Sequence, residues 1–225
     1  YPYVKEVTSH EHKITVDQAG LDELYDLIKH HGSLGDCMLK GGLKRDLVQE
    51  SRKGQSERNA LNGLLVLDVD GIKLNRALPS KQLSAAVVES LTEQVINTLP
   101  PAFHDVSYIS QASASLGMKG DKVSLHIFML LTVPMPPKSI KLWLQHINLN
   151  SDLFKPQIEL SSNGQSLKYP LDVSLADNSK LVFISTPTFD DPSSNPFISD
   201  DDRTILITRG NATVDLAAEM GAIRP

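Results

Sequence analysis

Two acidic side chains stand two residues apart at the end of an apolar run. Asp68 and Asp70 follow Leu64–Leu67 and precede Gly71. Because the side chains of a strand alternate between its faces, both carboxylates project to the same side, with their Cα atoms about 7 Å apart. Two close carboxylates repel each other, and a hard divalent cation bound by oxygen relieves that repulsion. The pair therefore predicts a metal site; the alternative is that one residue caps the coming loop and the other is solvated.

A second polar pair repeats this spacing farther along the chain. Ser124 and His126 share one face of a predicted strand, and Leu125 and Ile127 take the other face. A lone histidine in such a strand is more often a satisfied core or edge residue than a functional one. Asp172 follows a leucine and precedes an alternating segment. Taken alone, an aspartate shortly after a proline is typical of a turn.

Between residues 36 and 58 the apolar pattern breaks down and basic residues outnumber acidic ones. The acidic residues of this segment are Asp36, Asp46, Glu50 and Glu57, and the basic ones are Lys40, Lys44, Arg45, Arg52, Lys53 and Arg58. We therefore expect a loop-rich, locally positive patch upstream of the first acidic pair.

The spacing of apolar residues predicts the elements that position these side chains. A helix should begin after its N-cap, Asp17, and end at the stop signals His30, His31 and Gly32. The other predicted elements, in chain order, are a strand at 64–67, a helix from Pro79-Ser80 to Pro100, a hairpin of strands at 106–111 and 123–131 broken by Pro134, Pro136 and Pro137, a helix across 140–147, extended segments at 169–173 and 181–185, a solvated loop at 190–202 and a strand at 204–208.

The central order of these elements is β-α-β-β-α-β. This order is typical of a ferredoxin-like (RRM-like) sheet with two helices on one face. We expect a mixed α/β (α+β) fold in a single domain over residues 1–225, with an N-terminal α/β unit over about residues 1–60 and a core over about residues 61–210. Because the chain starts at Tyr1 and stops just after a short predicted helix, we expect a fragment of a longer polypeptide.

The combination of the motifs resembles the archaeo-eukaryotic primase superfamily, the primase-polymerases. The matching motifs are Leu67-Asp68-Val69-Asp70, Ser124-Leu125-His126 and Leu171-Asp172. Upstream, Cys37-Met38-Leu39-Lys40-Gly41-Gly42-Leu43 and Glu50-Ser51-Arg52-Lys53-Gly54 look like the lead-in of primase domains from phages, plasmids and related mobile elements, which are often fused to a replicative helicase. The resemblance covers roughly residues 35 to 190.

This resemblance implies a DNA-templated nucleotidyltransferase, a primase or polymerase that makes short primers on single-stranded DNA. The residues it implicates are Asp68, Asp70 and Asp172 as ligands of two Mg²⁺ or Mn²⁺ ions, Ser124 and His126 as contacts of the incoming nucleoside triphosphate, and Lys40 and Arg52 as contacts of phosphate oxygens in the nucleotide or the template. For the last two, a solvated surface base is the alternative. The implied partners are the DNA template, nucleoside triphosphates and a replicative helicase, in a prokaryotic cytoplasm.

The chain departs from the pattern of this superfamily in two respects. Many relatives carry an arginine-rich strand after the third motif, whereas residues 178–184 hold one basic residue, Lys180. No cysteine-rich zinc module is present in the sequence, because Cys37 is the one cysteine. The resemblance therefore supports nucleotide transfer more firmly than it supports the start of a new primer.

Two other functions compete with this interpretation. The run from Leu64 to Gly71 also resembles the nucleophile loop of haloacid dehalogenase-type phosphatases, in which Asp68 would attack phosphorus, Asp70 would be the acid, and Asp190 and Asp191 would complete a Mg²⁺ site. Against it, Ile72 replaces the usual Thr or Val and the loop lies some 60 residues into the chain. The second alternative is a non-catalytic module that stacks single-stranded bases on its sheet, which an aromatic content of 5% makes weaker.

The composition argues against a protein that coats nucleic acid, spans a membrane or depends on internal disulfides. With 225 residues, 22 basic and 27 acidic side chains, the net charge is −5, which argues against coating nucleic acid by bulk charge. The longest unbroken apolar run, Ile127–Leu131, is far too short to cross a bilayer, and the N-terminus has no basic-then-apolar signal. A single cysteine cannot form an internal disulfide, which fits a reducing cytoplasm. Any metal must therefore bind oxygen or imidazole ligands.

Overall fold

The structure, a computed structural model, describes residues 6–74, 78 and 82–222. Its helices are α1 (Gln18–Ser33), α2 (Ala85–Ile96), α3 (Pro137–Asn150) and α4 (Leu216–Ala222). Its strands are β1 (Cys37–Leu39), β2 (Asn62–Lys73), β3 (Tyr108–Ala112), β4 (Lys122–Met135), β5 (Glu159–Leu160), β6 (Leu167–Lys168), β7 (Leu181–Phe183), β8 (Thr204–Ile207) and β9 (Thr213–Val214). Within these ranges, no helix is long and apolar enough to cross a membrane.

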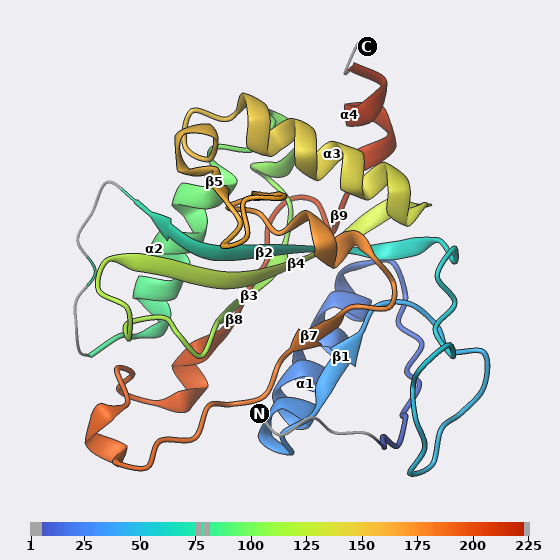
Figure 1. The fold of residues 1–225 in the computed structure, drawn as a ribbon, viewed down its shortest axis with the longest axis horizontal. Coiled ribbons are helices and arrows are strands. Elements are labelled where there is room, and N and C mark those ends of the chain that lie inside the picture. The colour runs from blue at the N-terminus through green and yellow to red at the C-terminus, as the bar shows by residue number, and fades with distance from the viewer. Residues whose placement is uncertain (1–5, 75–77, 79–81, 223–225) are drawn as a thin grey trace.

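The central sheet joins strands that are far apart in the sequence (Figure 1). Its order is β2-β4-β3-β8 with antiparallel neighbours, and β9 pairs with β4 in parallel. At the outer edge of β2, Leu171 forms a single antiparallel bridge with Val69. The strand that should follow α3 at this edge is thus reduced to one residue pair, and β8 lies at the opposite edge, beside β3. The predicted mixed α/β class is confirmed.

Helices cover both faces of the sheet (Figure 1). One face packs against α2 and α3, and its core includes Leu67, Val88 and Trp143. The other face packs against α1 and β7 through residues such as Leu21 and Val182. Burial of these apolar side chains is the dominant stabilising term for such a layered fold. The N-terminal α/β unit therefore shares a hydrophobic core with the sheet.

The first helix begins where the sequence predicts. The carboxylate of Asp17 accepts a hydrogen bond of 2.9 Å from the backbone N–H of Gly20, which caps α1. The second helix differs from its prediction. It begins at Ala85, and its predicted start at Pro79-Ser80 lies outside the described residues.

Two strands continue past their predicted ends. β2 runs through Asp68 to Lys73, because a register shift after Val69 returns the side chain of Ile72 to the core. β4 runs on although Pro134 lies within it. The register with β2 is interrupted at that end of β4, and a proline is tolerated where regular pairing is absent. The first acidic pair is therefore inside a strand and not at its end.

Candidate active site

Backbone pairing brings the three predicted motifs together at one part of the sheet. Asp68 lies directly opposite His126 on the neighbouring strand. The backbone N–H of Asp172 donates to the carbonyl oxygen of Asp68 at 2.9 Å, and that of Asp70 donates to the carbonyl of Pro170 at 3.0 Å. The third motif, which carries little information alone, thus lies beside the first because the chain returns to the outer edge of β2.

A bulge in β2 holds Ser124 against the first motif. Between Val69 and Ile72, two residues of β2, Asp70 and Gly71, face one residue of β4, Ser124. Gly71 has a φ of 69°, a backbone conformation that favours glycine. Its N–H donates to Ser124 Oγ at 3.0 Å. Because the serine oxygen accepts this bond, the hydroxyl hydrogen is left as a donor for a ligand.

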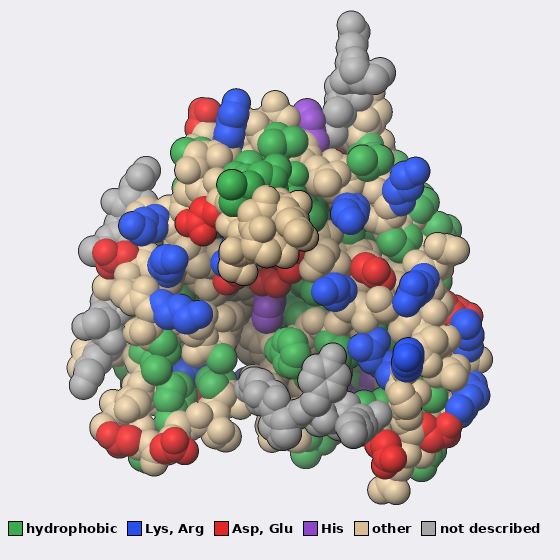
Figure 2. All heavy atoms as spheres, viewed as in Figure 1, with side chains coloured by type: hydrophobic (Ala, Val, Ile, Leu, Met, Phe, Trp, Pro, Cys, Tyr) green, Lys and Arg blue, Asp and Glu red, His purple; other side chains and the backbone are tan. Residues whose placement is uncertain are grey.

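The acidic side chains share a sheet face with apolar side chains that α1 buries. Val66 and Phe128 belong to the core beneath α1, and they stand two residues before Asp68 and two after His126 in their strands. Alternation keeps each pair on one face, so the polar site begins where the cover of α1 ends. Figure 2 shows a hollow over the middle of β2 and β4, with acidic side chains and a histidine at its base and Lys and Arg side chains around it.

Burial drives both central titratable groups toward their uncharged forms. Burial, with the charges of Asp172 and Asp70 as smaller causes, raises the pKa of Asp68 to about 7. Burial lowers the pKa of His126 to about 4. His126 Nε2 lies 3.5 Å from Asp68 Oδ1, and the buried His126 Nδ1 has no hydrogen-bond partner among the described residues. Charging either Asp68 or His126 therefore costs free energy when no cation is bound.

This electrostatic cost predicts that Asp68→Asn stabilises the metal-free protein at high pH. An aspartate in the unfolded chain has a pKa of about 4, whereas that of folded Asp68 is about 7. Between these values the folded state binds more protons, so the wild-type free energy of unfolding falls as pH rises from about 4 to about 7. Because asparagine does not titrate, the free energy of unfolding of the variant does not fall in this way. We expect its melting temperature to exceed that of wild type by several degrees at pH 8 and to match it near pH 4.

Thermal unfolding in metal-free buffer across this pH range measures the effect. The exposed Asp152 is not part of the site, and Asp152→Asn serves as the control for loss of one negative charge. A difference between Asp68→Asn and wild type that does not change with pH would contradict the buried-carboxyl explanation.

The other two carboxylates of the site already have partners. Asp70 Oδ2 forms an ion pair of 3.0 Å with Lys168 Nζ at the end of β6, and both side chains are about half exposed. Asp172 caps the 3₁₀ helix Val173–Ala176, accepting from the N–H and the hydroxyl of Ser174 at 2.8 Å each. Among the described residues, no three His, Cys, Asp or Glu side chains converge on one point to ligate a metal.

The donor set nevertheless fits the implied Mg²⁺ or Mn²⁺ ions in its chemistry. Carboxylate oxygens are the ligands that these cations prefer, and a bound cation would remove the cost of ionising the buried Asp68. The backbones of the three aspartates are already adjacent, so the residues that would hold a shared ion lie side by side. Asp70 is paired with Lys168, which would compete with a cation, whereas Asp172 keeps free lone pairs beside the two hydrogen bonds that it accepts from Ser174.

The two predicted phosphate-binding bases lie against a different segment. Lys40 Nζ donates to the carbonyl of Ala176 at 3.2 Å, and burial lowers its pKa to about 8. Arg52 donates to the carbonyl of Ser179 at 2.7 Å. Both side chains thus bind backbone oxygens that follow the third motif, and no contact between either base and the acidic side chains is found among the described residues.

One residue that the sequence analysis missed holds the third motif in place. Asn148 of α3 is fully buried and accepts from the N–H of Leu171 while donating to its carbonyl, both at 3.0 Å. The same side chain also donates to the carbonyl of Leu144. Asn148 thus pairs with Leu171 as a neighbouring strand would, opposite the bridge to Val69. Nothing in the local pattern of α3 distinguishes this asparagine from an ordinary helix residue.

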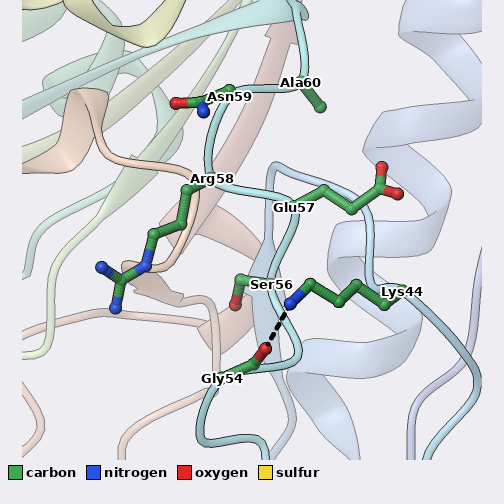
Figure 3. Close-up of a pocket in the computed structure, with 7 residues that line it drawn as sticks. All are labelled: Lys44, Gly54, Ser56, Glu57, Arg58, Asn59 and Ala60. Atoms are coloured by element: carbon green, nitrogen blue, oxygen red, sulfur yellow. Dashed lines mark hydrogen bonds between the residues drawn. The ribbon is translucent and has the colours of Figure 1, made fainter.

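Two cavities of the described structure are lined by none of the residues of the three motifs. One, of about 660 Å³, is lined by Lys44, Gly54, Ser56, Glu57, Arg58, Asn59 and Ala60. Figure 3 shows Lys44 reaching across it to the carbonyl of Gly54, a hydrogen bond of 2.9 Å, with Arg58 pointing to the other side. The other, of about 700 Å³, lies between the end of α1 and the loop at 184–201. Neither cavity is lined by Asp68, Asp70 or Asp172, although Gln111, which lies opposite His126 on β3, lines the second.

The tertiary structure thus assembles Asp68, Asp70, Asp172, Ser124 and His126, and it leaves Lys40 and Arg52 outside this group. The assembled residues lie on β2, on the neighbouring strand β4 and on the segment that pairs with the outer edge of β2. Comparison of the chain with protein-family models, with curated proteins and with solved structures gives no match.

Proposed function

We propose that the chain is the catalytic core of a DNA-templated nucleotidyltransferase of the primase-polymerase type. The observation that carries this proposal is the pair of backbone hydrogen bonds that join the third motif to the first, from Asp172 to Asp68 and from Asp70 to Pro170. A chance match of three short motifs gives no reason for them to meet, whereas a shared active site requires it. The backbone adjacency of the three aspartates, with the imidazole of His126 opposite Asp68, supports phosphoryl-transfer chemistry.

Each carboxylate has a role that follows from its environment. Asp70 is the most exposed of the three and would be the ligand that faces the substrate, while Asp68, at 24% side-chain exposure, would lie beneath it. Bound divalent ions would lower the pKa of the attacking 3′-hydroxyl and neutralise the leaving pyrophosphate. Asp172, on the chain that returns to the edge of β2, closes the ligand set. Loss of any one carboxylate weakens the charge balance that the reaction needs.

The polar residues of β4 would bind the triphosphate. Ser124 accepts from Gly71 and keeps its hydroxyl hydrogen as a donor for a phosphate oxygen. His126 is neutral at pH 7, because burial lowers its pKa to about 4, and its Nε2 lies 3.5 Å from Asp68 Oδ1. Because Ser124 and His126 lie opposite the acidic pair, a triphosphate bound to them would lie close to Asp68. Orientation of the reactants then supplies much of the rate enhancement.

A synthesis assay tests the proposal. The purified chain is incubated with labelled nucleoside triphosphates of either sugar type, Mn²⁺ or Mg²⁺, and single-stranded DNA with and without a primer. We expect labelled product that depends on both metal and template. Product without template would contradict templated synthesis, and absence of product with retained DNA binding would favour the non-catalytic module.

The structure weakens both alternatives without depending on that assay. For the phosphatase, Asp191 caps the 3₁₀ helix Pro192–Ser194 through Ser193 and is not among the partners of Asp68. For the stacking module, the large aromatic side chain of the sheet face, Phe128, is fully buried beneath α1. A covalent aspartyl-phosphate after incubation with a phosphate ester would revive the phosphatase interpretation.

The ion pair on Asp70 makes a separate prediction about metal affinity. Lys168 Nζ occupies the position on Asp70 Oδ2 that a divalent cation would take. We expect Lys168→Gln to bind Mn²⁺ several-fold more tightly than wild type, because a competing cation is removed. Electron paramagnetic resonance of free Mn²⁺ measures the affinity. Lys141→Gln, which removes a charge at an exposed position of α3, corrects for the change in net charge. Equal affinities for the two variants would show that Lys168 does not compete.

A further inference from the structure

Four of the seven histidines gather at one place outside the acidic site. His10 and His12 lie in the extended segment that precedes α1, and His30 and His31 lie in the last turn of α1. The ring centroids of His10, His12 and His30 are 5.9, 5.1 and 5.1 Å from that of His31. The proposed nucleotidyl transfer makes no use of these residues.

Two ring nitrogens in this cluster face each other at close range. His12 Nε2 lies 3.1 Å from His31 Nε2. On the other side of the same ring, His31 Nδ1 lies 2.8 Å from Asp36 Oδ2. Because a carboxylate accepts but does not donate, Asp36 holds the proton on Nδ1 and leaves the lone pair of His31 Nε2 directed at His12. A carboxylate behind an imidazole is the usual support of a metal-binding histidine.

We propose that His12 and His31 form a two-imidazole clamp for a late first-row divalent ion such as Zn²⁺. Zinc–nitrogen bonds of about 2.0–2.1 Å at a tetrahedral angle place two ligand nitrogens about 3.3 Å apart, close to the separation in the structure. Imidazole suits Zn²⁺ and its neighbours, whereas Mg²⁺ prefers oxygen. The clamp supplies two protein ligands, and water completes the coordination.

A bound ion would tie the N-terminal segment to α1. His12 belongs to a segment whose start is attached to residues 47–50 by the Val7–Glu50 bridge and by the backbone hydrogen bond from Ser9 to Leu47. His31 lies in the last turn of α1. The ion would therefore replace the hydrogen bond between His12 and His31 with a stronger attachment of this segment to α1. Because the ion binds the folded arrangement, its binding should raise the melting temperature in proportion to the logarithm of its concentration.

Isothermal titration of the full chain with Zn²⁺ tests the clamp. Excess Mg²⁺ in the buffer occupies any oxygen-rich site and leaves the imidazoles free. We expect one ion per chain, with at least about tenfold weaker binding in His12→Gln and in His31→Gln and about tenfold weaker binding in Asp36→Asn. The matched control is His146→Gln on α3, where a histidine outside the cluster is removed, and it should bind as wild type does.

The results separate this site from the acidic one. Zinc binding that survives Asp68→Asn with Asp70→Asn but is lost in His12→Gln supports the clamp. Binding that is lost in the double aspartate variant and kept in His12→Gln assigns the ion to the acidic site and overturns the clamp, as does the absence of saturable binding. Circular dichroism checks that each variant is folded, and the exposure of His12 makes a folding defect from its substitution unexpected.

Discussion

Asp70→Asn should reduce templated nucleotide incorporation by roughly 10³-fold or more while the protein stays folded. The substitution keeps the shape of the side chain but removes the charge through which the most exposed of the three carboxylates would hold a cation. The cost in stability should be at most about 1 kcal/mol, because the Asp70–Lys168 ion pair is about half exposed to solvent. Single-turnover incorporation at saturating Mn²⁺ and nucleotide measures the effect.

The control for this substitution is Asp152→Asn, which makes the same chemical change at an exposed position away from the site. It should retain wild-type incorporation. Metal affinity separates the two ways in which activity can be lost, because a missing ligand weakens Mn²⁺ binding and a misplaced substrate does not. Full activity of Asp70→Asn would remove the first motif from the chemistry and with it the proposed function.

Asn148→Ala should destabilise the protein by about 2–5 kcal/mol and should also lower incorporation. The side chain satisfies both the N–H and the carbonyl of Leu171, and each buried group left without a partner costs about 1–3 kcal/mol. The loss affects function because Leu171 directly precedes Asp172. Without the hydrogen bonds from Asn148, Leu171 keeps its bridge to Val69 on one side and loses its partner on the other. Urea denaturation gives the change in stability.

A neighbouring residue of the same type provides the matched control. Asn150 lies two positions along α3 and is exposed. Among the described residues, its side chain bonds only to His146 of the same helix. Asn150→Ala should change stability by no more than about 0.5 kcal/mol. If Asn148→Ala lowers stability but leaves the incorporation rate and Mn²⁺ affinity of the folded fraction unchanged, Asn148 stabilises the fold without positioning Asp172.

Local patterns were sufficient wherever a property depends on near neighbours in the chain. The cap of α1 by Asp17 follows from a short polar side chain before an apolar helical stripe. The shared face of Asp68 and Asp70, and that of Ser124 and His126, follows from the two-residue period of a strand. The choice of carboxylates as oxygen ligands for a hard cation is likewise a property of residue type. These features could be predicted without coordinates.

Other features depend on contacts between residues far apart in the sequence. Asp172 reaches the first motif because Leu171 is held between Val69 and Asn148, two partners that its own neighbours do not specify. Lys40 and Arg52 are typical phosphate-binding residues in isolation, yet each meets a backbone carbonyl more than 100 positions away. The elevated pKa of Asp68 arises from burial, which exists only once the layers are packed.

The sequence by itself therefore determined the chemistry that the side chains could perform and the faces on which they lie. The tertiary structure decided which of those side chains meet. The physical reason is that alternation and capping act over a few residues, whereas the site depends on long-range backbone hydrogen bonds and on where α1 stops covering the sheet. Asp172 shows the difference most clearly, as an unremarkable turn residue in the sequence and a neighbour of Asp68 in the fold.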